Sequence, residues 1–331
     1  MKTTASNENK RDFSQLGFQL FSIALGIMAV QIISAYVITT VAPGLTENYS
    51  LYFLANMLPY YFLGIPTILY LIKRQTSAPA SKHSLRFGQW FAAFCISYSL
   101  MYLSNFFGLF ITQMIGKMKG SPVENVIEKV ALDLNPFAAI LCMVILAPIF
   151  EELLFRKFII DKTAKYGEGI AIFISAFSFG LFHGNLNQFV YAFSLGLFWG
   201  FIYVKTRKIK YTICIHMVIN FMGSVLSTFL VQSEFFKAFS ALSNPADLKQ
   251  VLPLISEHAA GIIVYFIYTI FLLILVVAGI ILLCVNHKKI QLQSGEIVIP
   301  KGKRVQTILL NAGMLFHIIF WGIQIIAQLW N

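Results

Sequence analysis

The chain has 331 residues, of which 58% are apolar and 12% are charged, with a formal net charge of +11. Soluble domains average about 45–50% apolar and about 25% charged residues, so this composition excludes a soluble globular protein. It also excludes a disordered chain, which needs low hydrophobicity and high charge. We therefore expect a polytopic membrane protein whose apolar surplus, including 32 Phe residues, faces lipid.

Long apolar runs divide the chain into nine candidate spans, which predict an all-α fold: a transmembrane helix bundle of about eight or nine spans. A helix needs about 20 residues, or about 17 at the short end, to cross the hydrocarbon core. The fifth and sixth runs are short, so we expect them to pair tightly or to end within the membrane. The runs are 17–41, 51–72, 90–115, 137–160, 170–186, 189–204, 211–231, 259–285 and 305–330.

These spans predict four parts of the chain. Residues 1–16 form a short polar tail in the cytoplasm, and 17–135 carry the N-terminal transmembrane helices. Residues 136–231 form the core in which we expect the chemistry. Residues 232–331 hold a loop and the C-terminal helices, and the loop is interpreted as a connector rather than as an interfacial helix or a substrate rim.

Basic residues are distributed unevenly between the two sides of the predicted membrane. Twenty of the 25 Lys and Arg residues fall on the side of the N-terminus, and five fall on the other side. This asymmetry fits the positive-inside rule and predicts a cytoplasmic N-terminus. The positive charge therefore indicates topology rather than nucleic-acid binding. We expect an integral protein of a bacterial plasma membrane, with membrane lipid as a partner.

Two acidic residues lie well inside a predicted span, Glu151 and Glu152. A carboxylate in the membrane interior costs a few kcal/mol or more and usually faces a bundle interior or a water-filled cavity. Glu152 and Arg156 are four residues apart on one helix face, which predicts an ion pair. Glu151 lies about 100° further round the helix. It has no local partner, and we expect it to be free for chemistry.

Two histidines and an asparagine fall in later spans. His183 closes the fifth run, while His216 and Asn220 are four residues apart and share one face of the seventh. Glu151 and His183 each lie 16 residues from Gly167, the expected turn between the fourth and fifth helices. Because the two helical segments have the same number of residues, both side chains are expected at the same depth, roughly 24 Å from that turn.

The expected depth of His216 is harder to reconcile with this site. It lies only about six residues, or roughly 9 Å, past the loop at 205–210. The four side chains can meet only if the hairpin of the fourth and fifth helices projects beyond that loop, or if the seventh helix is displaced.

A glutamate in a partly dehydrated cavity suits a general base that activates water. His183, His216 and Asn220 could hold one divalent metal, zinc before others, with Glu151 polarising its bound water. Alternatively they could stabilise an oxyanion without metal. Both schemes hydrolyse a peptide bond. The HExxH signature of soluble zinc proteases is absent from the sequence, so a metal site would be assembled from separate helices.

Three motifs in successive spans resemble those of the CPBP family, the CAAX protease and bacteriocin-processing group of intramembrane endopeptidases, also called Abi. The resemblance covers about residues 137–231. The motifs are Glu151-Glu152-x-x-x-Arg156, Phe179-x-x-x-His183 and His216-x-x-x-Asn220.

The resemblance implies a multi-helix membrane endopeptidase of the CAAX prenyl endopeptidase type, either a metalloenzyme or a metal-independent glutamate enzyme. By this analogy Glu151 activates water, and His183, His216 and Asn220 bind metal or stabilise the oxyanion. Glu152 and Arg156 would support the site.

The expected partner is a peptide or lipidated-protein substrate: a CAAX-like tail, a bacteriocin precursor or another membrane-associated peptide. The alternative is a non-catalytic membrane protein: a bacteriocin-immunity binding partner, or a proton-linked transporter, in which intramembrane Glu and His residues relay protons. The sequence shows no inverted repeat of the kind that many transporters have, which favours the protease.

Overall fold

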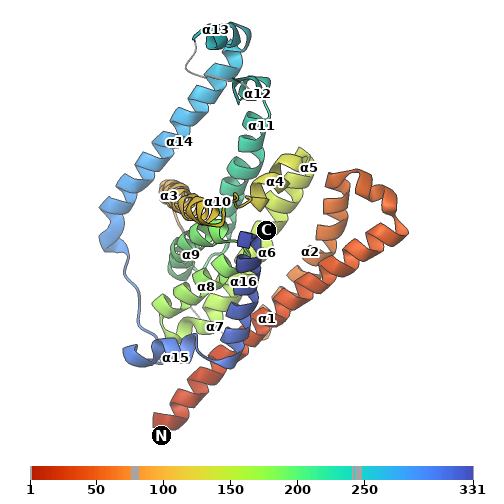
Figure 1. Ribbon diagram of the computed structural model, residues 1–331. Coiled ribbons are helices and arrows are strands. Elements are labelled where there is room, and N and C mark those ends of the chain that lie inside the picture. Colours follow the sequence, from red (N-terminus) through yellow and green to blue (C-terminus); the bar gives the residue numbers. More distant parts are fainter. Residues whose placement is uncertain (1, 76–81, 241, 243–247, 331) are drawn as a thin grey trace.

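The computed structural model describes residues 2–75, 82–240, 242 and 248–330. This part of the chain is built from helices, and eight of them are long and apolar enough to cross a membrane (Figure 1). The predicted all-α bundle is confirmed, and the protein is an integral membrane protein. The eight spans are Asn7–Val41, Tyr49–Lys73, Phe87–Lys119, Pro136–Tyr166, Leu186–Thr206, Lys210–Val231, Ala259–Lys289 and Ala312–Trp330.

The helices follow the apolar runs in chain order. Their bounds are α1 (Lys2–Val41), η1 (Pro43–Glu47), α2 (Tyr49–Lys73), α3 (Phe87–Lys119), α4 (Val126–Asp133), α5 (Pro136–Ala138), η2 (Ala139–Leu146), α6 (Ala147–Glu151), η3 (Glu152–Ile160), α7 (Asp161–Thr163), η4 (Ala164–Tyr166), α8 (Glu168–Phe182), α9 (Leu186–Thr206), α10 (Lys210–Phe221), η5 (Met222–Leu226), α11 (Ser227–Val231), α12 (Glu234–Ser240), α13 (Leu248–Glu257), α14 (Ala259–Asn286), η6 (His287–Lys289), η7 (Lys301–Lys303), α15 (Arg304–Ile308) and α16 (Ala312–Trp330).

The fifth predicted span is shorter than expected. It corresponds to α8, whose 15 residues are too few for a crossing. Gly184 has a φ of 64°, which turns the chain out of the helix. Asn185 then caps α9, since its side chain accepts a hydrogen bond from the Gln188 N–H at 2.8 Å. The sixth span, α9, has 21 residues and is long enough to cross.

Both ends of the helical region also differ from the expectation. The segment 1–16 is no free tail where it is described: α1 already starts at Lys2, and Phe13 and Leu16 are buried. The ninth predicted span is interrupted between α15 and α16. Asn311 caps the second of these helices by accepting from the Met314 N–H at 3.0 Å. The loop after residue 231 contains α12 and α13, while 241 and 243–247 lie outside the described residues.

The bundle has two distinct ends. We call one the basic end: it holds the start of α1, α7, α15 and the loops at 205–210 and 287–304, which carry many of the Lys and Arg residues. The far end holds α4, α5, α12 and α13 (Figure 1). Helices α3, α8, α9 and η3 form the centre, where the largest buried side chains gather. The outer helices α1, α2, α14 and α16 pack around them.

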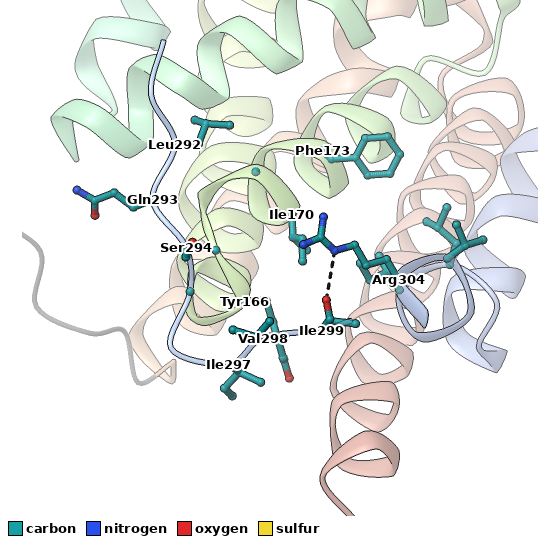
Figure 2. Close-up of a pocket in the computed structure, with 16 residues that line it drawn as sticks. Tyr166, Ile170, Phe173, Leu292, Gln293, Ser294, Ile297, Val298, Ile299 and Arg304 are labelled. Carbon is teal, nitrogen blue, oxygen red and sulfur yellow. Dashed lines mark hydrogen bonds between the residues drawn. The ribbon is translucent and has the colours of Figure 1, made fainter. Parts of the chain in front are cut away.

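An extended segment, residues 290–300, crosses the basic end over the turn between η4 and α8 (Figure 2). The Glu168 N–H donates to the Gln293 carbonyl at 3.1 Å, and the Ile297 N–H donates to the Lys165 carbonyl at 3.0 Å. A side chain at Gly295 would collide with backbone, because its Cβ would lie 2.2 Å from the Gly167 nitrogen. The segment therefore lies tightly against the turn.

Candidate active site

The helix that carries the two glutamates is not a regular α-helix. Its segments η2 and η3 are π-helical, and α6 lies between them. The Ala147 N–H donates to the carbonyl of Cys142, five residues earlier. Such π-helical stretches are rare and occur frequently at functional sites. The sequence, a plain apolar run, predicted only a helix here.

The π register explains how Asn220 is held. Pro148 follows Ala147 and has no N–H, so it cannot continue the five-residue pattern to the Met143 carbonyl. The Asn220 side chain donates from Nδ2 to that carbonyl at 2.8 Å. The amide thus replaces the missing backbone donor and ties α10 to the glutamate helix.

The predicted ion pair of Glu152 and Arg156 is present. Arg156 Nε lies 3.2 Å from Glu152 Oε2, and both side chains are 0% exposed. The guanidinium carbon lies 4.2 Å from the centre of the Phe179 ring and 5.4 Å from that of Trp199. Aromatic faces attract cations, and they stabilise this buried charge further. Arg156 is therefore a core residue of the bundle.

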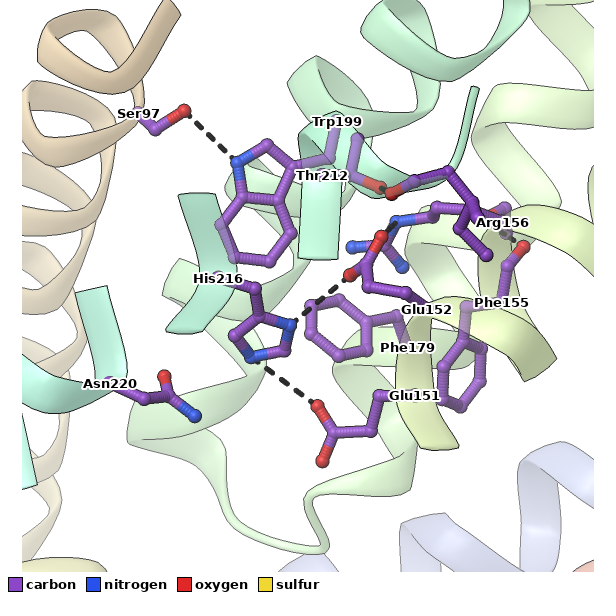
Figure 3. A network of polar contacts seen from close by, with 12 residues as sticks. Ser97, Glu151, Glu152, Phe155, Arg156, Phe179, Trp199, Thr212, His216 and Asn220 are labelled. Atoms are coloured by element: carbon purple, nitrogen blue, oxygen red, sulfur yellow. Dashed lines mark hydrogen bonds and ion pairs between the residues drawn. The ribbon is translucent and has the colours of Figure 1, made fainter. Parts of the chain in front are cut away.

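His216 connects both glutamates (Figure 3). Its Nδ1 lies 3.2 Å from Glu152 Oε1, and its Nε2 lies 3.5 Å from Glu151 Oε2. The Nδ1 contact is a hydrogen bond when that nitrogen carries a proton, and the Nε2 contact is attractive when a proton lies on Nε2 or on the Glu151 carboxyl group. The Trp199 ring packs 4.6 Å from the imidazole and is itself held by a 3.0 Å hydrogen bond from Nε1 to Ser97 Oγ. Glu151, without a partner on its own helix, finds one on α10.

The depth of His216 is explained by an ion pair near the basic end. Arg207 Nη1 lies 3.1 Å from Asp161 Oδ1, which places the 205–210 loop level with Asp161 rather than with the turn at Gly167. Asp161 is ten residues from Glu151, and Arg207 is nine residues from His216. The turn lies six residues further on, so the hairpin projects beyond the loop, the first of the two arrangements that the sequence allowed.

His183 ends α8, and its ring is oriented by its own helix. Nδ1 donates to the Phe179 carbonyl at 2.8 Å, in the arrangement where that nitrogen carries the proton. In the neutral ring this leaves Nε2 with a lone pair, which can accept a hydrogen bond or bind a metal.

A cavity of about 500 Å³ brings the candidate residues together. Glu151, His183, His216 and Asn220 all line it, and the side chains of Glu151 and His216 are 14% and 5% exposed. Glu152 and Arg156 lie behind this wall. Further lining residues were not singled out by the sequence, because the amides near 187 read as a loop between two apolar runs. Six of them are Tyr61, Asn105, Asn187, Gln188, Tyr191 and Trp199.

The side chains that were predicted to bind zinc, His183, His216 and Asn220, only partly resemble the ligands of known zinc sites. Two imidazole nitrogens and the Asn220 amide oxygen face the same cavity, but zinc sites in proteins are built from Cys, His and carboxylate ligands. Among the residues that the structure describes, no group of three or more His, Cys, Asp or Glu side chains is placed to hold a metal ion. Use of a metal stays a prediction.

Comparison with known proteins gives one match. Residues 133–222 match the family model described as type II CAAX prenyl endopeptidase Rce1-like, and this range includes all three motifs. No curated protein and no solved structure matched the chain. Residues 133–222 are therefore similar to the type II CAAX prenyl endopeptidase Rce1-like family, which confirms the resemblance to the CPBP family over this part of the chain.

Proposed function

We propose that this protein is an intramembrane endopeptidase in which Glu151 activates water to hydrolyse a peptide bond. One observation carries the proposal: the Glu151 carboxylate is on the wall of a cavity that His183, His216 and Asn220 also line. The matched family model supports a protease of the CAAX type. A cavity inside a helix bundle separates the reacting groups from lipid and can hold the water that the reaction consumes.

Two side chains are suited to accept the two protons of the attacking water, one by proton transfer and one by a hydrogen bond. The Glu151 carboxylate accepts one of its protons as the water oxygen adds to the carbonyl carbon of the substrate. His183 Nε2, with its lone pair fixed by the Nδ1 contact to Phe179, accepts a hydrogen bond from the other. Glu151 then passes its proton to the leaving amine as the C–N bond breaks, so the carboxylate is regenerated.

Asn220 and His216 are the residues that stabilise the oxyanion, the negative charge that develops on the carbonyl oxygen of the substrate. One N–H of the Asn220 amide is held by the Met143 carbonyl, which fixes the plane of the amide and leaves the second N–H for the cavity. The Nδ1 contact with Glu152 orients His216, and the protonated ring presents Nε2–H as the second donor. Donors that are fixed before the reaction stabilise the developing charge without reorganisation at the moment of attack.

A metal-dependent scheme uses the same residues differently. His183, His216 and Asn220 would hold a divalent ion such as zinc, which supplies a Lewis acid and a more acidic water. The donor set described above favours the metal-independent scheme. The two proposals differ in metal content and in sensitivity to chelators.

The substrate is proposed to be a membrane-associated peptide, either a CAAX-like tail or a bacteriocin-type peptide, and the enzyme to reside in a bacterial plasma membrane. A peptide bond within a membrane helix is hydrogen-bonded and hidden. The substrate must therefore offer an extended segment to the cavity.

The proposal is tested by comparing peptide termini in membranes and medium of host cells that express the wild-type protein or Glu151→Gln at equal levels. New termini should form with the wild type and be lost with Glu151→Gln, since a positioned general base contributes about 10²–10⁴-fold to the rate. Glu124→Gln is the matched control. Its carboxylate lies in an exposed ion pair with Lys129, and it should leave the termini unchanged. Identical termini in all three strains would contradict the proposal.

A further inference from the structure

The active-site cavity opens toward one end of the bundle. From the buried residues Trp199 and His216, the lining runs through Asn187 and Met143 to the exposed Glu128 and its neighbours at the start of α4. Helix α4 belongs to the far end (Figure 1). Among the described residues, none from the basic-end loops at 161–168, 205–210 or 287–304 lines the cavity.

The basic end is closed beneath the site. The fully buried pair of Glu152 and Arg156 follows Glu151 on the side of the basic end, and the guanidinium packs on Phe179 and Trp199 (Figure 3). Below this pair, Arg207 binds Asp161 and the segment 290–300 covers the turn of the hairpin. A separate apolar cavity of about 510 Å³ lies under that segment (Figure 2), and it shares no lining residue with the active-site cavity.

Charge indicates which end faces which compartment. Most Lys and Arg residues lie at the basic end, whereas Lys117, Lys119, Lys129, Lys237 and Lys249 lie toward the far end. Short loops rich in Lys and Arg stay in the cytoplasm.

We infer that the cavity opens to the extracytoplasmic side, so that the enzyme cleaves peptide segments that reach it from outside the cytoplasm. The inference rests on the proposed protease function and narrows its substrate class. A prenylated tail on the cytoplasmic face would meet the closed end of the bundle.

The cavity lining indicates what such a peptide looks like. Asn187 donates to Asn105 at 3.3 Å, and Gln188 donates to Tyr191 at 2.8 Å, so amide groups follow the path to Glu151. Amides both donate and accept, as an extended peptide backbone does. Within the described part of the chain, the lining contains Glu128 and Glu151 but no Lys or Arg, which favours a neutral or cationic segment over an acidic one.

The depth of the site adds a length requirement. Pro136, at the far end, and Glu151 are fifteen residues apart on one helix, or roughly 20 Å. An extended chain spans at most about 3.3–3.6 Å per residue, so roughly six residues of substrate must be free of structure to reach the glutamate.

The test uses single cysteine variants of the full-length protein in sealed spheroplasts and a bulky maleimide that does not cross membranes. Glu128→Cys places the thiol at the mouth of the cavity, and Lys129→Cys places it on the adjacent exposed position. Lys288→Cys is the matched control at the basic end, where the side chain is exposed. The unsubstituted protein reports the background from its four native cysteines. Peptide termini that depend on Glu151 are measured before and after labelling.

We expect Glu128→Cys and Lys129→Cys to be labelled in sealed spheroplasts, and Lys288→Cys only after permeabilisation. Labelling of Glu128→Cys should abolish the termini that this variant produces beforehand, while Lys288→Cys should retain them. The reversed labelling pattern overturns the inference, and so does unchanged proteolysis after complete labelling at the mouth. Absence of Glu151-dependent termini from unlabelled wild-type cells contradicts the proposed function instead, and the labelling pattern still reports which way the cavity opens.

Discussion

The central helices and the outer helices of this protein are held together in different ways. Around Glu151, contacts between helices are polar and specific: a buried ion pair, a histidine between two carboxylates and an amide on a backbone carbonyl. The outer helices meet the centre where small residues allow close approach, as at Gly279 of α14, whose added Cβ would lie 2.2 Å from the Cys95 carbonyl oxygen. The comparison shows that the geometry around Glu151 depends on specific polar partners, whereas the packing of the outer helices depends on the shapes of the surfaces that meet.

The largest effect is expected at the buried ion pair. Arg156→Met leaves the Glu152 carboxylate buried without its arginine partner, which should lower the free energy of unfolding by about 3–5 kcal/mol. The double variant Glu152→Gln, Arg156→Met removes both charges and should recover most of that loss. Thermal unfolding of the purified proteins in detergent measures both. Equal unfolding temperatures for the single variant and the wild type would show that the pair does not hold the centre together.

Asn220 should affect the reaction more than the fold. Asn220→Ala removes a fixed hydrogen-bond donor from the cavity, and loss of one such donor typically lowers kcat by about 10²–10³-fold. The lost bond to the Met143 carbonyl should cost about 1 kcal/mol of stability. Ser227→Ala, which removes a hydroxyl bonded to the Met222 carbonyl, is the control on the following helix. Near-normal turnover of Asn220→Ala would contradict the role of this amide in stabilising the oxyanion.

An outer helix should show the opposite pattern. Gly279→Leu would force α14 away from α3, and such overpacking typically costs about 1–3 kcal/mol. Turnover by the remaining folded protein should stay close to that of the wild type. Gly322→Leu is the control on another outer helix, because an added Cβ there meets nothing within 4 Å. A fall in turnover as large as that of Asn220→Ala would remove the distinction between the two regions.

The smallest effect is expected from metal removal. In the metal-independent scheme, dialysis against a zinc chelator leaves the turnover of purified protein unchanged, and elemental analysis finds metal well below one ion per chain. Loss of activity that zinc restores, together with one bound ion per chain, would establish the metal-dependent scheme instead.

The sequence predicted the members of the site better than their geometry. Charged residues in apolar runs are costly, so Glu151, Glu152 and Arg156 stand out, and the spacing of His216 and Asn220 places them on one face. The level at which α10 meets the glutamate helix depends on the contact of Arg207 with Asp161, two residues far apart in the sequence that no periodicity connects. The early end of α8 depends on the conformation of Gly184 and the cap at Asn185, which hydropathy does not register.

The π-helical winding of residues 139–146 makes this site sensitive to chain length. A π turn accommodates an extra residue relative to an α turn, so losing one residue there would return the helix to the α register and rotate its remaining turns by about 100°. Such a deletion changes neither charge nor hydropathy. It would nevertheless carry Glu151 off the cavity wall and separate Asn220 from the Met143 carbonyl. In aligned relatives, a gap in this segment would therefore be a sharper sign of lost activity than most substitutions.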